Sequence, residues 1–232
     1  MNIAVIPARG GSKRIPRKNI KNFCDRPMIS YAISAAIEST IFDHIVVSTD
    51  DAEIAQVAES FGAETPFLRP MELANDYTAT APVVAHAIEM CRKRGWVVEN
   101  VCCIYPCVPF IHAIDIGEAL KTLRDSDADY CFPVAHYPSP IQRAFKLLQN
   151  GGIQLLYPDF ELTRTQDLDV AYFDAGQFYW GEADAWLRNP RIHSNSVGYV
   201  VPNWRVVDID TIEDWTRAEI LAAAITRIKD SR

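Results

Sequence analysis

Short apolar runs alternate along the chain with longer segments whose apolar residues recur at helical spacing. The short runs are NIAVIP, HIVVSTD, NVCCIYP and ADYCFPVA, which begin at residues 2, 44, 100 and 128. Their nearly continuous apolar character is typical of strands that are covered on both faces, as in a parallel sheet. We therefore expect these runs to form one buried sheet.

The segments between these runs predict helices. They cover residues 27–39, 51–61, 80–95 and about 114–126. Pro27 suits the start of the first helix, and Gly62 and Gly95 suit the ends of the second and third. The repeated strand–helix order predicts an α/β fold with a mainly parallel sheet and helices on both faces. Ligands of such sheets bind at the carboxyl ends of the strands, which points to the loop after the first strand.

The regular order breaks between about residues 138 and 180. The stretch SPIQRAFKLLQNGGIQLLYP predicts two short strands around an Asn-Gly-Gly turn, and YFDAGQFYWG then returns as an aromatic-rich strand. We expect one domain over residues 1–232 with an insertion at about 138–170. This insertion is expected either to cover the sheet edge or to pair with a second subunit.

The composition is that of an ordinary globular protein, with 49% hydrophobic and 23% charged residues among 232. The chain contains no uninterrupted apolar run of about 18 residues, so the sequence indicates no membrane span. The six cysteines form neither a C-x-x-C pair nor a zinc-type spacing, and several lie in apolar runs. We expect buried free thiols and a reducing, cytoplasmic setting.

The charge distribution narrows the choice of partners. The net charge is −7, yet the first 21 residues carry six basic side chains and no acidic one, so the remainder carries −13. An acidic surface of this kind argues against general binding of nucleic acid. A local basic loop on an acidic protein instead indicates a compact polyanion such as a nucleoside triphosphate.

The basic loop follows the first strand as ARGGSKRIPRKNIK. Gly10 and Gly11 are expected to adopt positive φ and to bring backbone N–H groups close to phosphate oxygens. Arg9, Lys13 and Lys18 would supply the opposing charge. The loop matches neither G-x-x-x-x-G-K-[ST] nor G-x-G-x-x-G, so both common phosphate-binding fingerprints are absent. The alternative is a solvated basic loop or a localisation-type patch.

A second group of functional candidates lies in VVDIDTIEDW, residues 206–215. Asp208 and Asp210 are two positions apart at the expected end of a strand, so their side chains should point to the same side. Two carboxylates held together repel each other, and Mg²⁺ that bridges them to triphosphate oxygens would neutralise that charge. The alternative is that Asp210 caps the helix that begins near Thr211.

Polar residues of the irregular region form a third group. Arg143 and Arg164 are candidates to clamp a substrate carboxylate, with a surface ion pair as the alternative for each. Candidates to hydrogen-bond substrate hydroxyls or amides are Gln142, Asp174, Gln177 and Tyr179. Cys103 and Cys107 are conceivable nucleophiles, but their apolar neighbours favour packing in the core.

Three segments, IPARGGSKRIPRKNIK, LRPMELANDYTATAPVVAHAI and VVDIDTIEDW, resemble the sialic-acid-type cytidylyltransferases, also called CMP-nonulosonate synthetases. SPIQRA, RTQDLDVAYFDAGQFYWG and DIDTIEDW resemble more narrowly the members that act on pseudaminic acid. The resemblance implies a Rossmann-like nucleotidyltransferase fold. It also implies that CTP and a nine-carbon keto-sugar acid react to give the CMP-sugar, for surface glycans or flagellin, and pyrophosphate. Mg²⁺ is implied as well, and usually a homodimer whose insertion reaches across to the partner subunit.

The resemblance further implies roles for individual residues. Nucleotide binding would fall to Ala8, Arg9, Gly10, Gly11, Ser12, Lys13, Asn19, Arg69 and Thr80. Catalysis would fall to Arg9, Lys18, Asp208 and Asp210, of which the two aspartates hold the metal. Sugar binding would fall to Tyr105, Gln142, Arg143, Arg164, Asp174, Gln177 and Tyr179. Within this last group, Arg164 would hold the carboxylate of the acid.

One stretch departs from the family pattern. Sialic acid relatives carry Gln-Pro-Thr-Ser-Pro after the central strand, where this chain has YPCVPF, which argues against ordinary sialic acid as the substrate. Alternative substrates are legionaminic acid, sialic acid itself and the eight-carbon keto-sugar acid of lipopolysaccharide. An alternative of a different class is a module that senses CTP without turning it over. The retained Asp208 and Asp210 argue against such a sensor, which has little need of a metal pair.

Overall fold

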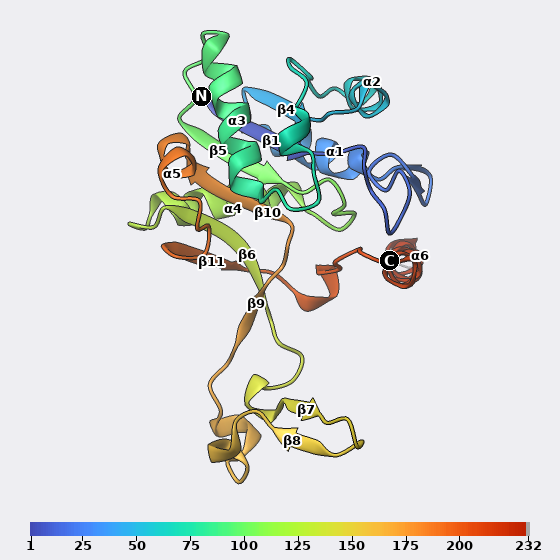
Figure 1. The fold of residues 1–232 in the computed structure, drawn as a ribbon, viewed down its shortest axis with the longest axis vertical. Helices are drawn as coiled ribbons and strands as arrows, with labels where there is room; N and C mark the ends of the chain where they lie inside the picture. Colours follow the sequence, from blue (N-terminus) through green and yellow to red (C-terminus); the bar gives the residue numbers. More distant parts are fainter. Residues whose placement is uncertain (231–232) are drawn as a thin grey trace.

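The computed structural model describes residues 1–230 and contains one α/β body (Figure 1). The sheet strands are β1 (Asn2–Pro7), β4 (His44–Ser48), β5 (Asn100–Ile104), β6 (Tyr130–His136), β9 (Tyr172–Asp174), β10 (Phe178–Glu182) and β11 (Ser196–Val200). The helices are α1 (Ile29–Ser39), α2 (Ala52–Ser60), α3 (Thr80–Lys93), α4 (Ala113–Arg124), α5 (Ala183–Arg188) and α6 (Ile212–Asp230).

The central sheet has the strand order β11-β6-β10-β5-β1-β4, and β9 pairs with β6 off that path. β1 is parallel to β4 and β5, and β11 is parallel to β6. Helices α1, α2 and α4 pack on one face of the sheet, whereas α3 and α5 pack on the other (Figure 1). The expected α/β fold with a mainly parallel, doubly covered sheet is therefore confirmed.

Strand β1 shows why the short apolar runs lack polar alternation. Ala4 and Ile6 belong to the core on the side of α1, while Ile3 and Val5 belong to the core on the side of α3. All four side chains are fully buried. A strand with helices on both faces needs apolar residues at every position, which is the pattern in the sequence.

Two details of the expected elements were wrong. Pro27 does not start the first helix: it lies in β3 (Arg26–Pro27), which pairs with β2 (Asn22–Phe23), and α1 begins at Ile29. The aromatic-rich segment at 172–181 is not one strand but two, β9 and β10, separated by a turn with Gly176 at φ +61. β9 and β10 both run antiparallel to β6, and after the turn β10 lies between β5 and β6.

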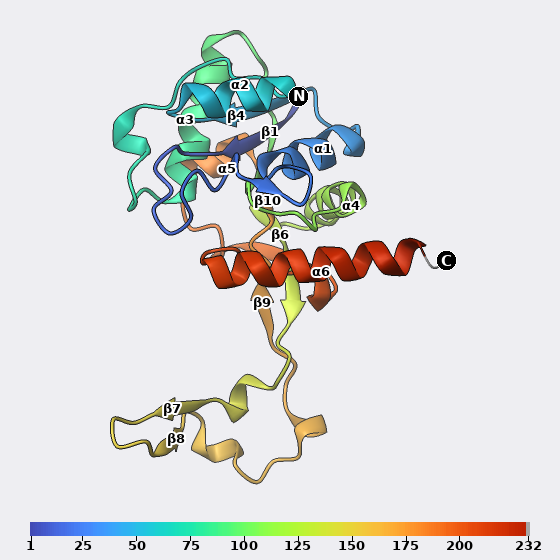
Figure 2. The same ribbon diagram turned by 90° about the vertical axis from the view of Figure 1, so that its right-hand side faces the viewer.

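The insertion at 138–170 forms an arm that leaves the body between β6 and β9. The arm lies away from the sheet in both ribbon views (Figures 1 and 2). It contains the expected hairpin, with β7 (Phe145–Leu147) paired to β8 (Ile153–Leu155) and Gly151 at φ +83 in the turn. In this chain the arm therefore does not cover the sheet edge.

Helix α6 crosses the body beside the loop that follows β1 (Figure 2). Its Trp215 and Ala218 pack in a separate core cluster with Ile15, Phe23 and residues near them. This packing brings the segment before α6 to the same edge of the sheet as the basic loop. Within residues 1–230, no helix combines the length and the apolar character needed to cross a membrane.

Candidate active site

A cavity of about 600 Å³ lies at the carboxyl ends of β1 and β5. Its walls come from residues 9–19, 69–83, 105–107 and 207–210, together with Gly176. Expected site residues that line it are Arg9, Ser12, Lys13, Lys18, Asn19, Arg69, Thr80, Tyr105, Asp208 and Asp210. The fold therefore brings the basic loop and the aspartate pair together from opposite ends of the chain.

Two cations of the basic loop meet the same carboxylate. Arg9 Nη1 lies 2.5 Å from Asp76 Oδ1, and Lys13 Nζ lies 2.5 Å from Asp76 Oδ2. The pKa of Asp76 is lowered by these hydrogen bonds, first from Lys13 and then from Arg9. The loop thus forms one side of a charged cavity wall, although the Lys13 side chain remains largely exposed.

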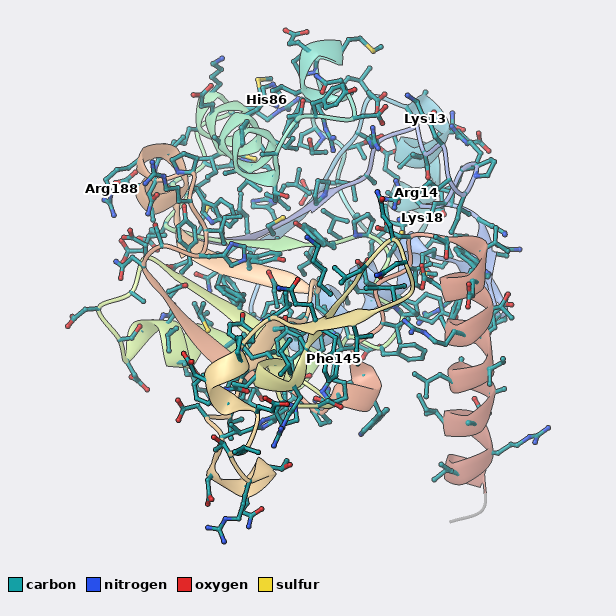
Figure 3. All side chains as sticks on the ribbon, turned by 60° about the horizontal axis from the view of Figure 1, so that its bottom comes forward. Lys13, Arg14, Lys18, His86, Phe145 and Arg188 are labelled. Atoms are coloured by element: carbon teal, nitrogen blue, oxygen red, sulfur yellow. The ribbon has the colours of Figure 1, made fainter. Side chains whose placement is uncertain are left out.

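Two more cations of the loop meet Asp210. Arg14 Nη2 lies 2.9 Å from Asp210 Oδ1, and Lys18 Nζ lies 3.5 Å from the same oxygen. Lys18 Nζ also donates to the carbonyl oxygen of Ile209 at 2.7 Å. Figure 3 shows Arg14 and Lys18 side by side on this loop. The basic loop is therefore tied directly to the segment that carries the aspartate pair.

The two glycines of the loop do not have the backbone conformation that we expected. Neither Gly10 nor Gly11 adopts positive φ, and the left-handed residue of this loop is Arg17, at φ 56. The Gly10 N–H donates to Asp50 Oδ1 at 2.9 Å. A Cβ at Gly10 would lie 2.6 Å from Asp51 Oδ2, so close packing explains this glycine. Neither glycine lines the cavity, nor does Ala8, which is buried in the core.

The Asn19 side chain stabilises the basic loop through two hydrogen bonds. Its side chain is buried, its Nδ2 donates to the carbonyl oxygen of Arg9 at 2.9 Å, and its Oδ1 accepts from Cys107 Sγ at 3.3 Å. Ser12 N donates to the carbonyl oxygen of Gly10 at 3.0 Å. These bonds hold the backbone of the loop around Arg9 and Ser12 in place.

Asp208 and Asp210 both face the cavity, although residues 206–210 do not form the expected strand. The pKa of Asp208 is raised, because its carboxyl is partly withdrawn from water and because Asp210 repels its charge. Asp210 does not cap α6. Instead Thr211 and Asp214 form the cap, with Asp214 N donating to Thr211 Oγ1 at 3.2 Å and Thr211 N donating to Asp214 Oδ2 at 2.9 Å.

Arg69 and Thr80 line the wall opposite the aspartates. Arg69 is buried and donates from Nε to Ser48 Oγ at 3.2 Å, and from Nη2 to the Ser48 carbonyl oxygen. Burial lowers the pKa of Arg69 to about 10, so the guanidinium remains charged at neutral pH. Thr80 Oγ1 lies 2.9 Å from the hydroxyl of Tyr105.

A second cavity, of about 640 Å³, adjoins the first and shares Ala79, Thr80 and Tyr105 with it. Tyr179 and residues 190–194 form its other walls, with Ala81. Asp174 lies behind this wall, and its Oδ2 accepts from the Tyr179 hydroxyl at 2.8 Å and contacts His193 Nε2 at 2.8 Å. Burial raises the pKa of Tyr179 well above its ordinary value, so this hydroxyl keeps its proton and donates.

Five of the expected sugar-binding residues line neither cavity of this chain: Gln142, Arg143, Arg164, Asp174 and Gln177. Arg143 and Gln142 hold the arm together, since Arg143 Nη1 donates to the Glu161 carbonyl oxygen at 2.7 Å and Gln142 Nε2 donates to that of Asp169 at 3.2 Å. Arg164 lies on the same arm, where its Nε is 2.6 Å from Asp167 Oδ2. Gln177 is buried in the body and donates to the Arg205 carbonyl oxygen at 2.8 Å.

The cysteines are free thiols, and four of them are buried. Burial raises the pKa of Cys107 to about 12 and that of Cys103 further still, so neither thiol ionises at neutral pH. A thiolate nucleophile is therefore excluded at both positions. Core packing, the alternative that their apolar neighbours favoured, explains Cys103.

Sequence reasoning missed Arg14, Asp76 and His193 as site residues. Arg14 was counted among the basic residues of the loop, but nothing in the pattern distinguished it from Arg17, which instead pairs with Asp51. Asp76 follows a turn in LANDYTAT, and only its position opposite two cations marks it. His193 can be recognised as a site residue only from its contact with Asp174.

The aspartate pair has the character of a Mg²⁺ site. Two carboxylates share one wall of the cavity, and the raised pKa of Asp208 reflects their repulsion. Mg²⁺ is commonly bound by one or two carboxylates together with substrate phosphates and water. The basic residues that line the same cavity would hold those phosphates, so the residues present fit this ion.

The chain is similar to known proteins over most of its length. A family model described as Cytidylyltransferase matches residues 3–181. The pseudaminic acid cytidylyltransferase of Campylobacter jejuni subsp. jejuni is 42% identical over 221 residues, 95% of each chain. The CMP-N,N'-diacetyllegionaminic acid synthase of Legionella pneumophila subsp. pneumophila is 30% identical over 94% of this chain and 95% of that one.

A solved structure supports the fold. It is that of a CMP:2-keto-3-deoxy-manno-octonic acid synthetase complexed with CTP, and it superposes with a TM-score of 0.70. The match covers 96% of this chain and 98% of the other at 17% identity. At that identity the likeness concerns the fold alone.

Proposed function

The chain belongs to the cytidylyltransferase family, and on that premise we propose that it transfers CMP from CTP to pseudaminic acid and releases pyrophosphate. One observation carries the proposal: four cations of the loop after β1 line the same cavity as Asp208 and Asp210, and two of these cations pair with Asp210. The similarity to the Campylobacter jejuni enzyme over 95% of both chains supports the choice of acid.

The nucleotide occupies the first cavity. Arg9, Lys13 and Lys18 bind the phosphates of CTP, because they are cations of the loop after β1 that line this cavity. Arg69 and Thr80 lie on the wall where the base and ribose fit. Since Asn19 already fixes the loop, little ordering is needed when the triphosphate binds.

The reaction is an in-line displacement at phosphorus. The anomeric hydroxyl oxygen of the acid attacks the α-phosphorus of CTP, and the bond from that phosphorus to the bridging oxygen of the β-phosphate breaks. The hydroxyl proton passes to water or to one of the two aspartates. Arg9, Lys13 and Lys18 stabilise the negative charge that moves onto the leaving pyrophosphate. Asp208 and Asp210 would hold Mg²⁺, which supplies further neutralisation of phosphate charge when bound.

The sugar acid occupies the second cavity, next to the nucleotide. Tyr105 belongs to both cavities, so it lies between the two substrates. The wall combines polar groups, such as His193, with apolar surface from Ile192 and Ala81. Such a mixed wall suits a sugar that carries hydroxyl and acylamino groups.

We also propose that two chains form a homodimer through the arm. Apolar side chains that the arm leaves exposed are Phe145, Leu147, Ile153, Leu156 and Leu162. Burial of these side chains against a second copy would be favourable, and Arg164 would then reach the sugar carboxylate in the partner's cavity. Free cysteines suit a reducing compartment, so we place the enzyme in the cytoplasm.

Pyrophosphate release with CTP and Mg²⁺ tests the proposal. Pseudaminic, legionaminic and N-acetylneuraminic acids and the eight-carbon keto-sugar acid are compared side by side. We expect release with pseudaminic acid and much slower release with the others. Release with another acid only would keep the reaction and replace the substrate. No release with any acid, from protein that still binds CTP, would favour a CTP-binding module instead.

A further inference from the structure

Asp76 is an acidic side chain in the part of the cavity where phosphates are expected. Its two oxygens bridge Arg9 and Lys13, each at 2.5 Å, and all three residues line the first cavity. A carboxylate is an acceptor with two charged oxygens, so it resembles a phosphate group to these donors. A triphosphate that takes these N–H groups displaces Asp76, because its negative charge also repels the carboxylate.

The segment around Asp76 is bonded mainly to itself. It connects η1 (Met71–Leu73) to α3, and Asn75 Nδ2 donates to the Glu72 carbonyl oxygen at 2.7 Å. Tyr77 N donates to Asn75 Oδ1 at 2.8 Å, and the Tyr77 ring is almost fully exposed. The pairs with Arg9 and Lys13 therefore fasten a self-contained turn to the basic loop.

Asp210 also neutralises cations of the loop, but it differs from Asp76. The proposed function already gives Asp210 a second charged partner, the metal, so its oxygens keep a role when CTP is bound. Asp76 comes from a separate turn that walls the cavity beside Asn75 and Thr78. When phosphates take over Arg9 and Lys13, the attachment of this turn to the basic loop is lost.

We propose that Asp76 is a counterion that exchanges with the phosphates of the nucleotide. It occupies Arg9 and Lys13 in the free enzyme, is displaced when the triphosphate binds, and returns as pyrophosphate leaves. This inference rests on the proposed function only in taking CTP as the natural ligand. Its physical content is a competition between one carboxylate and a phosphate chain for two donors.

Calorimetric binding to the Asp76→Asn variant tests the exchange, with CTP, pyrophosphate and tripolyphosphate as separate ligands. We expect each of them to bind about two- to fivefold more tightly than to the wild type, because exposed ion pairs are weak competitors. Cytidine, which lacks phosphate, should bind equally to both proteins. Glu72→Gln is the matched control: it removes a charge from the same turn, but Glu72 does not line the cavity.

Hydrogen exchange on the wild-type protein gives an independent readout that needs no variant. On addition of pyrophosphate, we expect faster exchange at residues 74–79 and slower exchange in the basic loop. Unchanged or weaker binding of phosphates to folded Asp76→Asn would overturn the inference, as would slower exchange at 74–79. Failure of the proposed function would look different: tripolyphosphate would still show the exchange, but no acid would release pyrophosphate from CTP.

Discussion

At the scale of single residues, Gly10 and Gly11 form a natural pair for comparison. Asp51 accepts from the N–H groups of Glu53 at 3.0 Å and Ile54 at 3.1 Å, and so caps α2. A hydrogen bond from Arg17 is the largest reason why the pKa of Asp51 falls to about 2. A Cβ at Gly10 would collide with this engaged carboxylate, whereas a Cβ at Gly11 meets nothing within 4 Å.

We therefore predict that Gly10→Ala lowers the free energy of unfolding by about 1–2 kcal/mol, the usual cost of a lost helix cap. Gly11→Ala should leave it unchanged, within about 0.5 kcal/mol, as is usual at open surface positions. Urea unfolding followed by circular dichroism measures both. Equal losses in the two variants would show that the loop needs flexible glycines and not close packing at Gly10.

Replacement of Asp208 should lower enzymatic turnover without lowering the stability of the fold. In the free enzyme its pKa lies above the ordinary value, because its carboxyl is partly buried and Asp210 is near. The folded state then holds this proton more tightly than the unfolded state, so stability falls as the pH rises from the unfolded pKa through the folded one. At neutral pH the charged carboxylate is thus a cost to the fold.

We predict that Asp208→Asn loses turnover by at least about a hundredfold, as for removal of a group that stabilises transition-state charge. Its melting temperature without ligand at pH 7 should equal or exceed that of the wild type. Asp127→Asn, an exposed aspartate that lines neither cavity, is the control and should change neither quantity. A clear fall in melting temperature would mean that Asp208 supports the fold itself.

Single residues also differ in whether the sequence alone could identify them as part of the site. Asp208 and Asp210 could be found because two acids at a spacing of two, next to a helix start, form a local pattern. Their common direction does not depend on the strand that was expected there, since the structure has none. Asp76 and His193 could not be found, because each acquires its partners from a distant part of the chain.

At the scale of elements, a buried ion pair fastens α4 to the connection that leads to the aspartates. Arg205, in η5 (Asn203–Arg205), is 8% exposed and Asp115, in α4, is 3% exposed. Asp115 Oδ1 accepts from Arg205 Nη2 at 3.3 Å and from the Tyr199 hydroxyl at 3.2 Å. The chain reaches Asp208 only three residues after Arg205, so this pair sets where the metal-binding segment begins.

We predict that Asp115→Asn costs about 3–5 kcal/mol in free energy of unfolding, since it leaves the Arg205 guanidinium buried without a counter-charge. The double variant Asp115→Leu/Arg205→Met should recover most of that loss, because apolar residues replace the whole pair. Urea unfolding of the two single variants and the double variant measures this coupling. Additive losses in the double variant would contradict it.

Local sequence rules predicted the ends of two helices correctly. The predicted helices 51–61 and 80–95 became α2 and α3, ending beside Gly62 and Gly95, which both have positive φ. The antiparallel direction of β10 could not be predicted, because an aromatic, fully buried strand looks the same in either direction. The arm between β6 and β9 reverses the chain, so that β9 and β10 both run antiparallel to β6, and a long insertion of this kind does not announce a reversal in the sequence.

At the scale of the whole molecule, the arm carries exposed apolar side chains that the proposed dimer would bury. Leu162 is 96% exposed in the isolated chain, and Leu147 is largely exposed too. We predict that replacing both by Asp shifts the dimer toward monomer, with a dissociation constant at least about a hundredfold higher, as for loss of interface anchors. Sedimentation velocity measures it. Ile114→Asp, on the exposed side of α4, should leave the dimer intact.

The role of Arg164 can be used to test whether each active site is built from one chain or from two. It lies on the arm and outside both cavities of its own chain, so we predict that it acts in the partner's cavity. Two differently tagged chains can be co-expressed and the mixed dimer purified through both tags. One pairing joins an Arg164→Ala chain with an Asp208→Asn chain. The other joins a wild-type chain with a chain that carries both substitutions.

If Arg164 acts across the interface, the first pairing contains one complete site, and its turnover per dimer should be about half that of the wild type. The second pairing should then be inactive, because the intact cavity faces an arm without Arg164. If Arg164 acts within its own chain, the two results exchange places: the first pairing is inactive and the second keeps about half. Both pairings carry the same two substitutions in total, so a general loss of stability cannot imitate either result. The two pairings differ only in how the two substitutions are distributed between the chains. Their turnover therefore shows whether the site is built from one chain or from two.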